Sequence, residues 1–199
     1  MSIFESSEDK QKTGPLAGKR IAILATEGFE EVELTEPLRA LRDAGARVDV
    51  IAPESGIKTG QIKGWDMTEW GKKVDVDVKL SDADATLYDA LHLPGGLMNP
   101  DRLRLIPAAV SFVQSFFTAQ KPVSAICHAP WMLIEAGVVK GRTLTSWSSL
   151  RTDLLNAGAH WVDQEVVVDG NLTTSRNPDD LPAFNKQIIE AFGKVRQSV

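Results

Sequence analysis

Lys121-Pro-Val-Ser-Ala-Ile-Cys127-His128-Ala-Pro-Trp131 is the stretch that decides the fold of this chain. A short apolar strand over 123–126 runs directly into a helix that opens near Ala129, and the only cysteine of the 199 residues lies at the joint. A side chain at such a joint projects from the carboxyl edge of the sheet, where open α/β sheets place their ligands. The pattern predicts a nucleophile elbow, a turn that needs small residues on either side, and Ala125 and Ala129 meet that need.

Cys127 is therefore the predicted nucleophile. The start of a helix directs unpaired N–H groups and the positive end of its dipole at the sulfur, which favours the thiolate. His128 follows directly and could add positive charge or take a proton. The alternative for a lone cysteine is a small hydrophobe packed in the core. The small neighbours, the following histidine and the strand-to-helix joint favour a reactive thiol.

The composition indicates one globular domain, residues 19–199, preceded by a disordered polar leader over 1–18. Hydrophobic residues make up 43% of the chain, enough for a well-filled core, and the net charge of −5 comes from mixed charges without a basic run. We therefore expect no specific nucleic-acid site. A single cysteine excludes an internal disulfide, and no signal peptide or membrane span is evident. These features predict a cytoplasmic protein without membrane association.

Hydrophobic runs and helical periodicities alternate along the chain. Strands are predicted at 20–25, 47–51, 88–93, 123–126, 142–145, 161–168 and 172–175. Helices are predicted after Glu30, from about 101 to 117, after Ala129, over 150–157 and after 178–180. Segments 61–63 and 74–78 are predicted to form an antiparallel hairpin at a sheet edge. This order is typical of an α/β fold, a three-layer α/β/α sandwich around a mostly parallel sheet.

Three loops should meet at the carboxyl edge of that sheet: 26–30, 94–101 and 127–128. Glu30 is predicted to approach Cys127, although a carboxylate at a helix start is an equally good reading of its position. Gly95 and Gly96 could supply backbone N–H donors opposite the sulfur, or simply form a turn. Adjacent residues at a sharp turn rarely face each other, so either the His128 ring swings back to Cys127 or it serves another step.

Two further histidines, His92 in an apolar strand and His160 beside a tryptophan, are predicted to be packed or surface residues. No group of cysteine, histidine and carboxylate residues has the spacing of metal ligands, so the sequence predicts no metal. Asp101 fits the start of the helix over 101–117, where capping is its simplest role.

Taken together, several motifs resemble the PfpI family, the intracellular-protease and general-stress-protein branch of the parkinsonism-associated deglycase superfamily. The matching stretches are Glu30-Glu31-Val-Glu33-Leu34, Leu93-Pro94-Gly95-Gly96, Ala125-Ile-Cys127-His128-Ala129-Pro130, Asn156-Ala-Gly158, Gln164-Glu165-Val-Val-Val-Asp169, Thr174-Ser175-Arg176 and Pro178-Asp179-Asp180-Leu181.

The resemblance implies a flavodoxin-like sandwich, a homodimer or higher homo-oligomer, and no cofactor. It also implies that Cys127 is nucleophilic with Glu30 as its carboxyl partner. A third implication is a triad of cysteine, histidine and acid, in which Asp101 stands where relatives often carry Glu and reaches His128 within the chain or in a neighbouring subunit. Ala129 replaces the glycine usual after Cys-His.

The activities attributed to the family include peptidase, deglycase, glyoxalase and chaperone. We expect a stress-response cysteine hydrolase that acts on electrophilic carbonyls, such as methylglyoxal or glyoxal adducts. The alternatives are an intracellular cysteine peptidase and, from another class, a redox sensor or holdase in which Cys127 is oxidised. The glutaminase half of an amidotransferase shares the elbow, but it needs a His-x-Glu dyad near the C-terminus, and no histidine follows His160.

Overall fold

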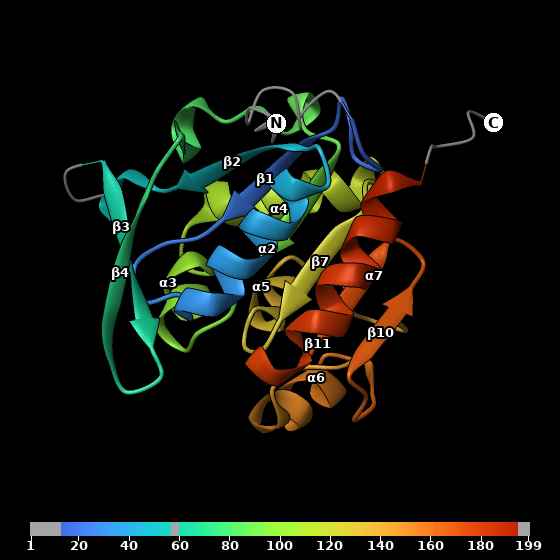
Figure 1. The fold of residues 1–199 in the computed structure, drawn as a ribbon. Coiled ribbons are helices and arrows are strands. Elements are labelled where there is room, and N and C mark those ends of the chain that lie inside the picture. Colours follow the sequence, from blue (N-terminus) through green and yellow to red (C-terminus); the bar gives the residue numbers. More distant parts are fainter. Residues whose placement is uncertain (1–12, 57–59, 195–199) are drawn as a thin grey trace, which may run out of the picture.

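A seven-stranded sheet forms the middle layer of the computed structural model (Figure 1), which describes residues 13–56 and 60–194. All neighbouring strands are parallel except the pair at one edge, β10 and β11. In sheet order the strands are β10 (Val166–Asp169), β11 (Leu172–Ser175), β7 (Val123–Ile126), β6 (Ala90–Leu93), β1 (Arg20–Leu24), β2 (Arg47–Ala52) and β5 (Val78–Lys79).

Helices cover both faces of this sheet, because its central strands are apolar on both sides. One face carries α2 (Glu31–Asp43) and α7 (Leu181–Gly193), which lie side by side in front of the sheet in Figure 1. The other face carries α3 (Met98–Leu103), α4 (Pro107–Thr118), α5 (Pro130–Glu135) and α6 (Arg151–Asn156). Buried apolar side chains form one cluster on each face. The predicted three-layer α/β/α sandwich is confirmed.

The helix expected over 101–117 is two helices. The residue before a proline favours an extended backbone, and Ile106, which precedes Pro107, is extended with φ −104° and ψ 105°. The chain therefore leaves α3 after Leu103 and begins α4 at Pro107, where the missing N–H costs nothing. Short 3₁₀ turns occupy Glu54–Gly56, Leu80–Asp82, Ala85–Leu87, Ser148–Leu150 and Pro178–Asp180.

The predicted edge hairpin is a separate two-stranded sheet rather than part of the central one. Its strands are β3 (Gln61–Asp66) and β4 (Glu69–Asp75), and the edge of the central sheet is β5. The hairpin packs over the loop after β1, because the Trp65 N–H donates to the Phe29 carbonyl at 2.7 Å. A second small sheet pairs β8 (Thr143–Leu144) with β9 (His160–Trp161), so the strand predicted over 161–168 is divided in two.

The leader predicted to be disordered over 1–18 ends earlier than expected. Leu16 is fully buried in the cluster beneath α2 and α7, and its N–H donates to the Ala44 carbonyl at 2.9 Å. A buried leucine with a backbone hydrogen bond fixes this segment to the domain. Residues 1–12 lie outside the described part.

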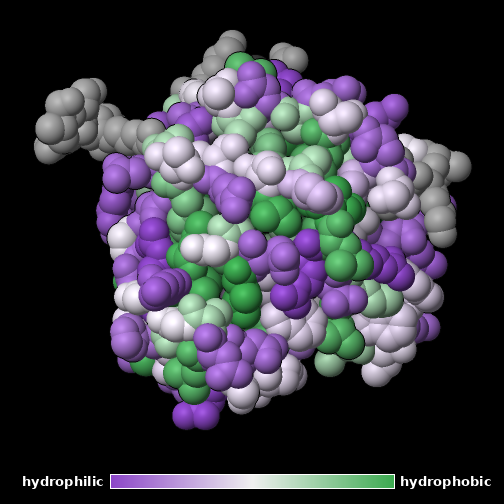
Figure 2. Space-filling model, turned by 180° about the vertical axis from the view of Figure 1, so that it is seen from behind, coloured by the Kyte–Doolittle hydropathy of each residue, from purple (hydrophilic) through white to green (hydrophobic). Residues whose placement is uncertain are grey.

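Figure 2 shows the opposite side of the molecule, where apolar side chains form patches between polar ones. In the part of the chain that the structure describes, no helix is both long enough and apolar enough to cross a membrane.

Candidate active site

Cys127 sits at the predicted joint between β7 and α5, with a backbone φ of 61°. This left-handed conformation is strained for a residue with a Cβ, and it persists where the surroundings fix the backbone. Here the Cys127 N–H donates to the Ser175 carbonyl at 3.1 Å, and the Cys127 carbonyl accepts from the Trp147 N–H at 2.9 Å. Its side chain is 6% exposed. The strand β11 and the segment after β8 therefore hold the elbow in place.

Residues 95 and 96, in the loop after β6, must be glycines because the backbone there passes close to the elbow. A Cβ on Gly95 would lie 2.6 Å from the Cys127 Cβ and 2.5 Å from Glu33 Oε2. Gly96 has a φ of 80°, and a Cβ there would lie 2.5 Å from the Glu30 nitrogen. The N–H groups of Gly96 and His128 both hydrogen-bond to the Cys127 sulfur. Of the two glycines predicted to supply N–H donors opposite the sulfur, Gly96 directs its N–H at the sulfur, whereas the Gly95 N–H donates to Glu33 Oε2 at 3.0 Å.

The carboxyl group next to the sulfur belongs to Glu33, not to Glu30 as the sequence suggested. Glu33 is fully buried, and its Oε2 accepts from the Gly95 N–H at 3.0 Å. Its Oε1 has no other hydrogen-bond partner among the described residues, which leaves it to the adjacent Cys127 thiol. Burial raises the pKa of Glu33 to about 8, with a smaller contribution from the charge of Glu30. Glu33 therefore keeps its proton at neutral pH and can donate a hydrogen bond.

Glu30 lies at the mouth of the same site. It occupies the N-cap position of α2, and its Oε1 accepts from the Met67 N–H at 3.4 Å, at the tip of the β3–β4 hairpin. Burial raises the pKa of this half-buried carboxyl. The physical reason for the misassignment is helical geometry: Glu33 is one turn further along α2, on the face that carries Leu34 and Leu41 into the core, and Glu30 precedes the helix.

The helix start was expected to favour the thiolate of Cys127, but burial opposes this. Loss of water around the sulfur raises the pKa of Cys127, and a charge on Glu33 would raise it further, whereas the N–H groups of Gly96 and His128 lower it. The helix dipole therefore lowers the pKa of Cys127 by less than burial raises it. Since Glu33 is protonated at neutral pH, its charge is absent there and its O–H becomes a third donor to a thiolate.

His128 turns back towards the cysteine, which settles the question its position left open. Its Nδ1 lies 3.2 Å from the Cys127 sulfur. The ring packs between two tryptophans, stacked on Trp147 with centroids 5.9 Å apart and edge-on to Trp131 at 5.4 Å. Burial lowers the pKa of His128, so the neutral ring is favoured. A neutral Nδ1 that faces a thiol can accept its proton.

A pocket of about 320 Å³ opens above the sulfur. Its lining combines acids, aromatic rings and apolar side chains from the hairpin, the glycine loop and the elbow: Glu30, Glu33, Trp65, Met67, Gly96, Leu97, Cys127, His128, Trp147 and Pro178. Trp65, Met67, Leu97 and Trp147 were not predicted from the sequence, because they come from segments far apart in the chain. The signal in the sequence is a large apolar residue in a turn, such as Met67, and its exposed fraction of 80% becomes evident only in the structure.

The chain is similar to proteins of a known family. Residues 19–191 match the sequence profile of the DJ-1/PfpI family. The chain belongs to that family. The chain is 45% identical over 178 residues to General stress protein 18 of Bacillus subtilis (strain 168), covering 89% of this chain and 99% of that protein. It is 42% identical over 171 residues to Deglycase PfpI of Pyrococcus furiosus, covering 86% and 98%. The names of such relatives suggest a hydrolase.

Solved structures agree with this membership. The crystal structure of Drosophila melanogaster DJ-1beta superposes with a TM-score of 0.78 at 30% identity, covering 88% of this chain and 91% of that one. The predicted family is therefore confirmed, and the fold that carries the elbow is the one its members share.

Asp101, the acid suggested for a triad in this family, does not join the site within the chain. It is exposed on α3, is not among the pocket residues, and its side chain makes no hydrogen bond or ion pair with any described residue. An interaction with His128 would need Asp101 of another copy of the chain. Among the residues that the structure describes, no three His, Cys, Asp or Glu side chains are grouped as metal ligands.

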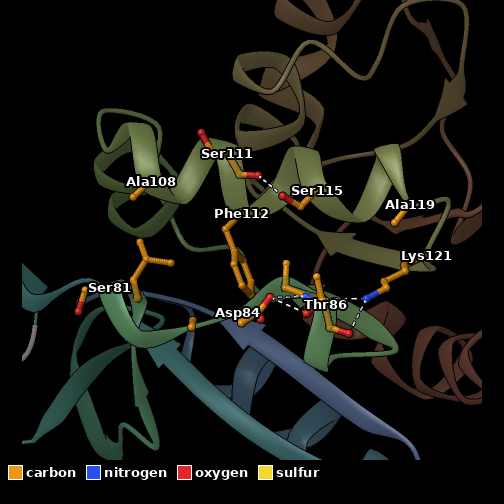
Figure 3. Close-up of a pocket in the computed structure, with 12 residues that line it drawn as sticks. Ser81, Asp84, Thr86, Ala108, Ser111, Phe112, Ser115, Ala119 and Lys121 are labelled. Carbon is orange, nitrogen blue, oxygen red and sulfur yellow. Dashed lines mark hydrogen bonds between the residues drawn. The ribbon is translucent and has the colours of Figure 1, made fainter.

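A second and larger hollow, of about 540 Å³, lies along α4 (Figure 3). Phe112 projects from α4 towards the segment that carries Asp84 and Thr86, and Lys121 points to Thr86. Asp84 accepts from the Thr86 N–H at 2.8 Å, and the Lys121 ammonium donates to the Thr86 carbonyl at 3.2 Å. The lining of this hollow contains neither a thiol nor an imidazole.

Proposed function

We propose that this protein is a cysteine hydrolase that acts on small electrophilic carbonyls, such as methylglyoxal or glyoxal adducts of amines. The observation that carries the proposal is the thiol of Cys127, 3.2 Å from a neutral imidazole nitrogen and beside a buried carboxylic acid, at the base of a small apolar pocket. A nucleophile, a base within hydrogen-bond reach and positioned donors are the parts that acyl and carbonyl chemistry needs.

The chemistry begins with attack of the sulfur on the carbonyl carbon. His128 Nδ1 takes the thiol proton as the carbon–sulfur bond forms, and the carbonyl oxygen becomes an oxyanion. The N–H groups of Gly96 and His128 and the Glu33 O–H surround the reacting sulfur and can stabilise the developing charge. The imidazolium then gives its proton to the amine as the carbon–nitrogen bond of the adduct breaks, and a proton shift between the two carbons of the former dicarbonyl converts the hemithioacetal into a thioester. Water cleaves the carbon–sulfur bond of that thioester and releases a 2-hydroxy acid and the free thiol.

The size and the lining of the pocket favour a small substrate over an extended peptide. A volume of about 320 Å³ is at the lower end of ligand pockets. Its rim is aromatic and aliphatic, and neither Lys nor Arg lines it, so it offers no cation for an anionic substrate. A peptidase would need a longer cleft. Peptide hydrolysis is therefore the alternative that a substrate screen has to exclude.

We also propose that the working form is a cytoplasmic homo-oligomer in which Asp101 of one copy faces His128 of another. The support is the exposure of Asp101 on α3, the helix that follows the exposed pocket residue Leu97. Light scattering reports the assembly. Asp101→Asn should lower turnover without changing the mass of the assembly, and full activity of this variant in a monomeric protein would contradict the proposal.

The decisive experiment compares wild type and Cys127→Ala on methylglyoxal-modified N-acetylarginine, on free methylglyoxal and on a fluorogenic peptide. We expect wild type to release the amine from the adduct and the variant to be inactive. Faster cleavage of the peptide would favour the peptidase. If neither protein processes any carbonyl and both suppress aggregation of a client equally, the protein is a holdase.

A further inference from the structure

A proline inside α2 leaves the backbone of Glu33 without its helical partner. In an α-helix the N–H of residue 37 would donate to the carbonyl of residue 33. Residue 37 is a proline, buried within the helix, and has no N–H. The Glu33 carbonyl is therefore left to find a donor elsewhere in the interior, where an unpaired carbonyl is costly.

His92 supplies that donor from the central strand β6. Its Nε2 lies 2.9 Å from the Glu33 carbonyl oxygen, and its Nδ1 lies 3.0 Å from the Ser124 hydroxyl on β7. A carbonyl can only accept, so Nε2 carries the proton. Burial lowers the pKa of His92 to about 4, which keeps the ring neutral and leaves Nδ1 to accept from the Ser124 O–H. One tautomer is therefore fixed at both ends.

Glu33 is thus held twice by the same strand and the loop that follows it. His92 on β6 holds its backbone, and the N–H of Gly95, three residues later, holds its side chain at 3.0 Å. Glu33, His92 and Ser124 are all fully buried. The Phe184 ring from α7 covers His92, with ring centroids 5.8 Å apart, and offers no hydrogen bond.

We propose that His92 is a positioning residue for the reaction: it replaces the helical N–H that Pro37 lacks and so holds the Glu33 carboxyl against the Cys127 sulfur. This extends the proposed function, since it concerns the same nucleophile, but it does not depend on which carbonyl is the substrate. The first turns of α2 are therefore positioned at the site by the His92 side chain of β6 rather than by a hydrogen bond within the helix.

The test is the rate of iodoacetamide alkylation of Cys127 against pH, read by intact mass, with thermal unfolding of each variant. His92→Leu removes the donor and should lower the alkylation rate at pH 7, where Glu33 holds its proton, about tenfold. His92→Gln places an amide N–H near the position of Nε2 and should stay within twofold of wild type. Phe184→Leu is the matched control, since it loosens the packing around His92 without touching the hydrogen bond.

Adding Pro37→Ala to His92→Leu supplies the missing helical N–H and should raise the rate at pH 7 at least threefold above that of His92→Leu alone. The proposal is overturned if Phe184→Leu lowers the rate at pH 7 as far as His92→Leu does, if the glutamine variant behaves like the leucine variant, or if Pro37→Ala restores nothing. Because alkylation needs no substrate, a failure of the proposed carbonyl chemistry would appear separately, as absent turnover in a wild type with a normal alkylation profile.

Discussion

Two hollows of this protein, one along α4 and one over the elbow, differ in how their polar groups are satisfied. In the larger one, along α4, polar groups of the lining hydrogen-bond within the protein: Ser115 donates to the Ser111 carbonyl at 2.8 Å, and Asp84 accepts from the Thr86 N–H. The smaller one, over the elbow, keeps a strained cysteine, a carboxyl oxygen without another partner and four side chains with shifted pKa values. Strain and unmet polar groups, rather than volume, indicate where the chemistry takes place.

The largest expected effect separates the two hollows directly. Cys127→Ser should lower turnover of the adduct about 10⁴-fold or more, because the nucleophile is replaced by a much poorer one at the same place. Ser115→Ala, in the hollow along α4, should leave kcat/KM unchanged. Steady-state kinetics on both variants measures the contrast. Equal losses in the two variants would show that the elbow has no special role.

The next effect concerns the close approach of Gly95 to the elbow. Gly95→Ala should lower kcat/KM about 100-fold by displacing the reacting groups, and it should destabilise the fold by about 2 kcal/mol through overpacking. Gly141→Ala is the control, because Gly141 has a positive φ of 76° but no atom within 4 Å of an added Cβ. Its cost should appear in urea unfolding only, and a loss of activity there would contradict the steric account.

Burial of Glu33 should appear in the pH dependence of stability. The unfolded carboxyl ionises near pH 4.5 and the folded one near 8, so between these values only the folded chain holds the proton. The free energy of unfolding therefore falls as pH rises through this range, by about 1.4 kcal/mol per pH unit from this group alone. Glu33→Gln removes the effect, so its stability relative to wild type should increase up to pH 8 and then level off.

Urea unfolding at half-unit steps from pH 5 to 9 measures this difference. Glu36→Gln, a substitution on the same helix but away from the core, is the control and should not reproduce the curve. A constant difference between Glu33→Gln and wild type would mean that Glu33 is ionised in the folded protein at neutral pH.

The smallest effect comes from the backbone strain at Cys127. Glycine adopts a positive φ freely, so Cys127→Gly should be about 1 kcal/mol more stable than Cys127→Ala, although it loses a methyl group. Differential denaturant unfolding of the two inactive variants checks this. A less stable glycine variant would show that the elbow is not strained.

The sequence predicted what depends on local pattern. The strand-to-helix joint at Cys127 and the layered fold follow from apolar runs and small residues, and the structure has both. The sequence pointed to Glu30 as the carboxyl next to the sulfur, whereas the structure has Glu33 there and Glu30 at the mouth of the same pocket. The stripe of Leu34 and Leu41 along α2 includes Glu33, so helical periodicity could have indicated the buried acid.

Long-range contacts lay beyond that kind of prediction. Trp147 reaches the elbow only because its N–H bonds the Cys127 carbonyl, and Met67 because a hairpin separate from the central sheet crosses the loop after β1. No local pattern encodes such pairings. By contrast, the sequence does show that Pro37 lacks the N–H that the Glu33 carbonyl would need. That His92 supplies the replacement donor becomes evident only when β6 is placed against α2.

Glu33, and not Glu30, is the acid coupled to the nucleophile. The most direct test is the pH profile of Cys127 alkylation in wild type, Glu33→Gln, Glu33→Leu and Glu30→Gln. At pH 7, where Glu33 holds its proton, loss of the O–H donor should lower the alkylation rate about tenfold in Glu33→Leu and by less in Glu33→Gln, whose amide still donates. Glu30→Gln should leave this rate unchanged. A faster rate at pH 7 in Glu33→Leu, or a larger change in Glu30→Gln than in Glu33→Leu, would contradict the assignment of Glu33.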